Sequence, residues 1–340
     1  MSYLSSIKEG ITIVNKNWQL VLIQLAFILF SFISFFLVVG IPIAIAFILF
    51  GLDFTEILRL KDVLSIFQGS IELLKRYFGM AVLVIMSFIF YLTTIVILWV
   101  FTLAGTMGLL ATTIQDATQQ FTMRRFLHEG RRFFLHLFTF LLVIGIIFIS
   151  LAIILSVIGS GVSTVIEIAE TQEATLALFF GVFFSLVLFS LGLFLILSTL
   201  SIAVYGMAYM SFHKSRTWET LIETLKYLYA RPASIGLYGT LFLGYGLIGF
   251  LVILMGSPLA LIPILGALLS LPYQLIMYII QGYVGLITLA AIFYYFFKTG
   301  LPQPLPGQSF VTPEKTWSNE GSHISEDLTG AQPPVPEQRD

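Results

Sequence analysis

Four polar residues recur at equivalent places along the chain, and together they are the candidates for a shared polar site. Each precedes a glycine or a threonine by one position: Glu9, Gln68, Glu129 and Glu223. An enzyme acting at the inner leaflet would need these side chains to converge, because catalytic groups must first meet in space. The alternative role is structural, with each side chain contacting a neighbouring helix or cation. Glu129, for example, has Arg125 and Arg132 at helical spacing.

The composition determines the elements that must position these residues. Of 340 residues, 58% are hydrophobic and only 10% are charged, and the mean hydropathy is +0.98. A soluble domain carries about 25% charged residues, so this chain could not cover a water-facing surface. Several apolar runs exceed the roughly 18 residues that indicate a transmembrane helix. We therefore predict an all-α polytopic membrane protein with six to eight transmembrane helices.

The absence of certain residue types argues against several classes of activity. The chain has no cysteine, and its four histidines are scattered. The centres of the apolar runs contain no Asp, Glu, Lys or Arg, whereas proton pumps, voltage sensors and ion-coupled carriers keep ionisable groups there for use. Intramembrane metalloproteases need His and carboxylate ligands. We expect a protein that is not an enzyme, with no cofactor and no metal site.

Basic clusters suggest the orientation, because cytoplasmic loops carry an excess of Lys and Arg. This rule predicts an inner-membrane protein with both termini in the cytoplasm. It also places clusters on both sides of the apolar stretches 18–51 and 79–114, so we expect tight or partly re-entrant hairpins there, with a single long span in each as the alternative. The clusters are Lys8 and Lys16; Arg59, Lys61, Lys75 and Arg76; Arg124, Arg125, Arg131 and Arg132; Lys214, Arg216, Lys226 and Arg231; and Lys298.

The later apolar stretches are predicted to form two further hairpins. Residues 134–158 should pair with 175–200 across an outer loop, and 233–255 with 274–297 across a short broken segment at 259–271. The glycines between 236 and 249 indicate close helix–helix packing. The repeated motif divides the membrane domain 1–298 into units at about 1–58, 59–118, 119–212 and 213–298.

Segments 60–78, 119–133 and 213–230 mix cations with apolar residues, as interfacial helices do. Either they only anchor the neighbouring spans, or they also bind anionic lipid headgroups, which attract each nearby cation by about 1 kcal/mol. The cations expected to contact headgroups are Lys75, Arg76, Arg124, Arg125, Arg131, Arg132, Lys214 and Arg216.

Residues 299–340 differ from the rest in composition. They hold seven of the twelve prolines and six acidic residues against two basic ones, so they cannot bury enough apolar surface to fold alone. We expect a disordered, acidic cytoplasmic tail, with a docking segment for a protein partner as the alternative.

Two segments carry a family resemblance, one over 126–134 (FLHEGRRFF) and one over 220–228 (TLIETLKYL). With them, residues 1–298 resemble a broad group of prokaryotic membrane proteins, and in particular the membrane domain attached to some glycerophosphodiester phosphodiesterases. The resemblance implies an architecture of interfacial helices followed by spans. The chain has no soluble domain to hold the hydrolase, so that activity does not carry over.

The function expected from the sequence is that of a non-catalytic scaffold or accessory subunit, organising a membrane complex or a lipid environment. Its partners would be membrane lipids and a protein bound in the membrane or at the tail, and not nucleic acid. The alternative is a passive carrier or channel for a lipid or small apolar solute. A solid, Phe-packed bundle favours the scaffold, whereas a polar cavity favours transport.

Overall fold

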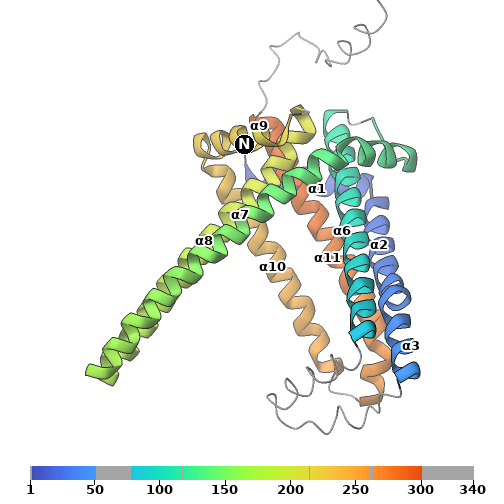
Figure 1. Cartoon of the computed structure of the whole chain (residues 1–340). Helices are drawn as coiled ribbons and strands as arrows, with labels where there is room; N and C mark the ends of the chain where they lie inside the picture. The colour runs from blue at the N-terminus through green and yellow to red at the C-terminus, as the bar shows by residue number, and fades with distance from the viewer. Residues whose placement is uncertain (1, 51–77, 117, 214, 261–262, 301–340) are drawn as a thin grey trace, which may run out of the picture. The chain divides into compact units, whose positions relative to one another are not determined.

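The computed structural model describes residues 2–50, 78–116, 118–213, 215–260 and 263–300, and within these ranges every regular element is a helix. The all-α prediction is therefore confirmed. In chain order the elements are α1 (Tyr3–Lys16), α2 (Gln19–Phe35), the π-helix η1 (Phe36–Gly40), α3 (Ile41–Phe50), α6 (Phe78–Gln115), α7 (Met123–Gln172), α8 (Ala174–His213), α9 (Thr217–Ala230), α10 (Ala233–Ala260) and α11 (Pro263–Gly300) (Figure 1).

Six stretches of these helices are long and apolar enough to cross a membrane, within the predicted range of six to eight. The protein is thus a multi-pass membrane protein. The stretches are Gln19–Ile45, Val82–Gln115, Met123–Thr171, Ala174–His213, Ala233–Gly256 and Pro272–Gly300.

The hairpins expected in 18–51 and 79–114 were wrong, since each stretch is a single long helical run. Pro42 lacks the N–H that an α-helix needs, and the π-helix just before it takes up the irregularity without turning the chain. In α6, Gly105 and Gly108 are points of close contact with α7 and do not break the helix. The cations Arg59, Lys61, Lys75 and Arg76 lie outside the described residues.

The connections predicted inside the two later hairpins are also shorter than expected. Helix α7 continues to Gln172 and α8 begins at Ala174, so the predicted outer loop is helical. Gly159 and Gly161 stand in open space on α7, and a glycine costs a helix only about 1 kcal/mol, too little to end so long a run. Likewise α10 reaches Ala260 and α11 begins at Pro263, so 259–271 is no separate broken segment.

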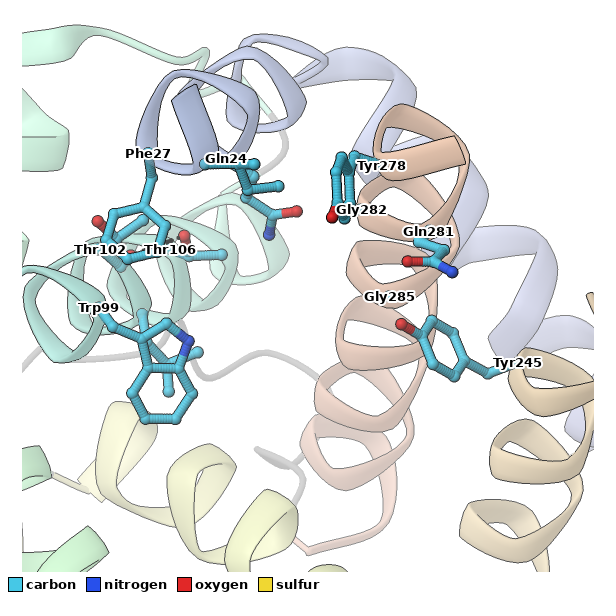
Figure 2. Close-up of a pocket in the computed structure, with 12 residues that line it drawn as sticks. Gln24, Phe27, Trp99, Thr102, Thr106, Tyr245, Tyr278, Gln281, Gly282 and Gly285 are labelled. Atoms are coloured by element: carbon cyan, nitrogen blue, oxygen red, sulfur yellow. Dashed lines mark hydrogen bonds between the residues drawn. The ribbon is translucent and has the colours of Figure 1, made fainter. Parts of the chain in front are cut away.

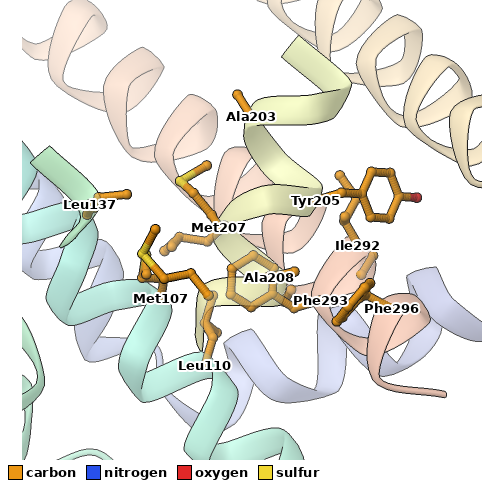
Figure 3. Packing of buried hydrophobic residues seen from close by; sticks show 14 of the residues in the cluster. Met107, Leu110, Leu137, Ala203, Tyr205, Met207, Ala208, Ile292, Phe293 and Phe296 are labelled. Atoms are coloured by element: carbon orange, nitrogen blue, oxygen red, sulfur yellow. The ribbon is translucent and has the colours of Figure 1, made fainter. Parts of the chain in front are cut away.

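The hydrophobic core lies where the ends of α6, α8 and α11 meet the beginning of α7 (Figure 3). Its largest fully buried side chains include Tyr205, Phe140, Phe293 and Phe296. Gly206 on α8 leaves room for the ring of Phe140, whose Cε atoms would lie 3.1 and 3.2 Å from a Cβ at that position. At this contact between α7 and α8 a residue without a side chain thus accommodates a large ring, which keeps the core closely packed.

The recurring motif of the sequence is a packing motif in the described copies. On α1 the buried residues include Ser6 and Gly10, and on α9 they include Thr220 and Thr224, four positions apart in each helix. A Cβ on Gly10 would lie 2.9 Å from the backbone nitrogen of Ala291 on α11. The small residue that follows the recurring Glu thus faces a neighbouring span on α1, and on α9 it is buried. The third copy, at 126–130, lies in the first turns of α7 itself, where a Cβ on Gly130 would lie 2.9 Å from the ring of Phe101 on α6.

Beyond this core α7 and α8 continue as a pair of helices packed along each other (Figure 1). Between Ile144 and Thr199 the buried residues among the described side chains are Ala169 and Ala177, close to the turn that joins the two helices. In the outer part of this hairpin, therefore, few side chains are buried, and the two helices contact mainly each other. We call residues 145–198 the outer hairpin.

Candidate functional site

The described members of the recurring polar set have separate surroundings. Glu9 is exposed on α1, and Glu223 on α9 accepts a hydrogen bond from Lys226 Nζ at 2.6 Å. Glu129 is 6% exposed and belongs to α7, and Gln68 lies outside the described residues. The structure thus places three carboxylates on three helices, each with its own partner or with solvent. It gives no support to an enzyme built from them.

Glu129 acts in the contact between α7 and α6. Arg132 Nη1 donates a hydrogen bond to Glu129 Oε2 at 3.4 Å. The Cβ of Glu129 would lie 2.7 Å from a Cβ placed on Gly108 of α6. A buried carboxylate is costly without a partner, and here the arginine one turn further along α7 provides it. This arrangement corresponds to the structural alternative considered for Glu129 from the sequence.

Some of the predicted headgroup cations come together at the start of α7. A pocket of about 510 Å³ is lined there by Thr122, Arg124, Arg125, Leu127, His128, Glu129 and Arg131. The N-terminus of a helix is itself partly positive, so the pocket combines three guanidinium groups with a favourable dipole. Arg132 pairs with Glu129, Arg216 directly precedes α9, and Lys75, Arg76 and Lys214 lie outside the described residues.

The turn before this pocket is organised around Asp116. Its Oδ1 accepts hydrogen bonds from the backbone nitrogen of Thr118 at 2.9 Å and the Thr118 hydroxyl at 2.6 Å, and its Oδ2 accepts one from Gln119 at 3.1 Å. These bonds, those from Thr118 first, lower the pKa of the Asp116 carboxyl. The turn is therefore held by an ionised group at neutral pH, and it leads directly to the arginines.

We expect neutralising one pocket arginine to weaken binding of an anionic lipid about fivefold. Arg131→Gln removes one cation, which near a membrane surface contributes about 1 kcal/mol. Lys226→Gln is the matched control, because that charge is already paired with Glu223. Spin-labelled phosphatidylglycerol, measured for its association with the purified protein at low salt, reports the difference. Equal losses in both variants would show that the pocket has no special role.

Four of the five glycines in the run of α10 stand in open space, contrary to the close helix–helix packing expected from the sequence. A Cβ on Gly239, Gly244, Gly246 or Gly249 would meet no atom within 4 Å. At the start of the run, Gly236 is approached by the hydroxyl of Tyr3, which donates a hydrogen bond to the carbonyl of Ala233. These glycines leave open space beside Tyr245.

Tyr245 borders a second pocket, which sequence reasoning missed. It encloses about 330 Å³ between α2, α6, α10 and α11 (Figure 2). Its polar lining residues are uncharged, and the lining consists of Gln24, Phe27, Ile28, Trp99, Thr102, Leu103, Thr106, Tyr245, Tyr278, Gln281, Gly282 and Gly285. We call it the intramembrane pocket, because each of these residues belongs to a candidate span. The signal in the sequence is the pair of glutamines within apolar runs, which carry no charge.

Within the described part of the chain, no group of three or more His, Cys, Asp or Glu side chains is arranged to hold a metal ion. Comparison with known proteins found no matching family model, no matching curated protein and no matching solved structure.

Proposed function

We propose that this chain is a non-catalytic scaffold or accessory subunit that organises a membrane complex or a lipid environment. In this proposal it resides in an inner membrane with both termini in the cytoplasm. The observation that supports the role is the outer hairpin, two apolar helices that leave the core with their outer faces unpaired. From the segments quoted above, we also propose a distant relationship to the phosphodiesterase-attached membrane domains.

The outer hairpin is long enough to cross a membrane with few contacts to the rest of the protein. From Ile144 to Gln172, at 1.5 Å per residue, α7 extends roughly 42 Å, which exceeds the hydrocarbon thickness of about 30 Å. On α8, the exposed face of the outer hairpin includes Phe179, Phe183 and Leu186, which are spaced four and three residues apart and so lie on one side of the helix. A transmembrane partner could pack against this continuous apolar stripe. Without a partner, lipid acyl chains cover it.

Replacing this stripe should release a protein partner without unfolding the chain. We expect the triple substitution of Phe179, Phe183 and Leu186 by alanine to reduce co-purification of the partner at least tenfold, while stability changes little because the three side chains are exposed. The matched control replaces Leu243, Leu247 and Phe250 of α10, which have the same spacing and similar exposure. The measurement is quantitative mass spectrometry after affinity purification in mild detergent.

Native mass spectrometry of the protein released from its own membrane gives the first test of the role itself. A stoichiometric protein partner, or a retained shell of specific lipids, is the expected result. A bare monomer that keeps neither, and a stripe variant that behaves as the control does, would contradict the proposal.

The intramembrane pocket supports a second candidate, a passive carrier for a lipid or small solute, because a carrier needs a polar cavity between its spans. Movement of a labelled lipid across vesicles containing the purified protein would distinguish the two roles. If the protein is only a scaffold, the labelled lipid should cross the vesicle membrane at the same rate as in protein-free vesicles.

A further inference from the structure

We propose that the intramembrane pocket binds a neutral lipid whose head group is a hydroxyl, of the diacylglycerol kind. This goes beyond the scaffold role, since a scaffold needs no such pocket. The proposal rests on where the pocket lies, which groups line it and what keeps it open.

The pocket opens among membrane-spanning segments rather than at the water-facing end of the protein. Gln24 lies roughly 8 Å beyond the first residue of α2, at 1.5 Å per residue, and Thr106 lies nine residues before the end of α6. Trp99 and Tyr278, which line the same pocket, are both more than one-third exposed. In a bilayer these exposed edges face acyl chains, so a ligand can enter from the lipid.

Apart from Thr106, whose hydroxyl donates to the carbonyl oxygen of Thr102 at 2.8 Å, the polar side chains that line the pocket are without hydrogen-bond partners among the described residues. This holds for both glutamine amides, for the indole N–H of Trp99 and for the hydroxyls of Tyr245 and Tyr278. In hydrocarbon an unsatisfied polar group is costly. A ligand that both donates and accepts hydrogen bonds would relieve several of these groups at once.

Glycines on α11 keep the pocket open. The side-chain oxygen of Gln24 lies 2.8 Å from where a Cβ on Gly282 would stand, so any other residue there would displace the amide. A Cβ on Gly285 would contact the ring of Tyr245 at 3.7 Å. Figure 2 shows both glycines on the strip of α11 between Gln24 and Tyr245. The Gln24 amide and the Tyr245 ring therefore each lie against bare backbone of α11.

The lining indicates a neutral ligand with an apolar body. Among the described residues that line it there is no lysine, arginine, aspartate or glutamate, so a phosphate or an ammonium group would be buried there without a counter-charge from them. Phe27, Ile28 and Leu103 supply an apolar wall beside the amides. The volume of about 330 Å³ lies at the lower end of the usual range for small-molecule sites, which suits a head group and its glycerol but not whole acyl chains.

The test uses the full-length protein in phosphatidylcholine nanodiscs. We expect added diacylglycerol to be retained as one molecule per protein in native mass spectra and to raise the unfolding temperature. Gln24→Leu and Gln281→Leu should each weaken binding at least tenfold. Gln274→Leu is the control, because it makes the same change on α11 at a residue outside the pocket. Free glycerol and phosphatidic acid are tested in parallel.

Retention of diacylglycerol by the parent protein and the control, but not by the two pocket variants, supports the proposal. Binding of free glycerol with equal strength would overturn its lipid part, and equal binding of phosphatidic acid would overturn its neutral part. No retention by the parent protein, or unchanged retention by Gln24→Leu and Gln281→Leu, would overturn it entirely. None of these results depends on finding a protein partner, so the scaffold role can fail separately.

Discussion

Gly206→Ala should lower the free energy of unfolding by about 1–3 kcal/mol, the usual cost of adding volume to a packed core. Phe140→Ala should lower it by about 3–5 kcal/mol, because it removes a fully buried ring. In the double variant we expect a loss smaller than the sum by about 1 kcal/mol or more, since the new methyl group enters the space that the ring has left.

The reason lies in the contact between α7 and α8. The ring of Phe140 lies directly over Gly206, closer than any side chain there would allow, and Phe140 has no exposed surface through which it could move away. Tyr205 and Met207, on either side of the glycine, are buried as well. The strain of Gly206→Ala therefore cannot be relieved by a small shift of one side chain.

Unfolding of the four proteins of this cycle by SDS titration in mixed micelles measures the coupling. Gly181→Ala, on the same helix but in open space, is the control and should be neutral or slightly stabilising. Additive losses in the double variant would mean that the two residues do not contact each other in the membrane-embedded protein.

Composition alone was sufficient to predict the fold class, because apolar runs of this length have few other structures available in a membrane. The connections were harder to predict. The positive-inside rule led to hairpins in 18–51 and 79–114. The π-helix η1 before Pro42 and the glycine contacts along α6 instead allow each stretch to continue as one helical run. Glycine itself was ambiguous: a Cβ on Gly105 or Gly108 would collide with side chains of α7, while a Cβ on Gly244 or Gly246 would meet no atom within 4 Å. Sequence cannot distinguish these cases, because the difference lies in which helix passes opposite.

The candidate site shows the same limit. The recurrence of Glu9, Glu129 and Glu223 is visible in the sequence, but its meaning depends on the small residue that follows each of them. Gly10 is buried against α11 and Thr224 is buried on α9, whereas Glu9 is exposed. Conversely, Gln24 and Gln281 could not be predicted as site residues from charge, because their amides are neutral. Only the packing of four helices brings them to one pocket.

Gly10→Leu should detach α1 from α11 and lower the free energy of unfolding by about 3 kcal/mol, the upper end of the usual overpacking cost. A Cβ at this position would lie 3.0 Å from the carbonyl oxygen of Ile287 and the Cβ of Ala291. These are backbone or near-backbone atoms of a long helix, so the neighbour cannot turn aside as a flexible side chain would. Gly239→Leu adds the same side chain to α10 in open space, and we expect it to be tolerated.

The natural absence of cysteine allows detachment of α1 to be measured directly. Ser6 on α1 is fully buried, so a Ser6→Cys protein should react slowly with a maleimide reagent. Adding Gly10→Leu should raise the labelling rate at least tenfold, while adding Gly239→Leu should leave it unchanged. Rapid labelling of Ser6→Cys alone would show that α1 is not held against α11, and unchanged protection in Gly10→Leu would show that the recurring glycine has no packing role. If instead the labelling follows the expected order, the recurrence first noticed as a possible catalytic set is a means of docking surface helices onto spans.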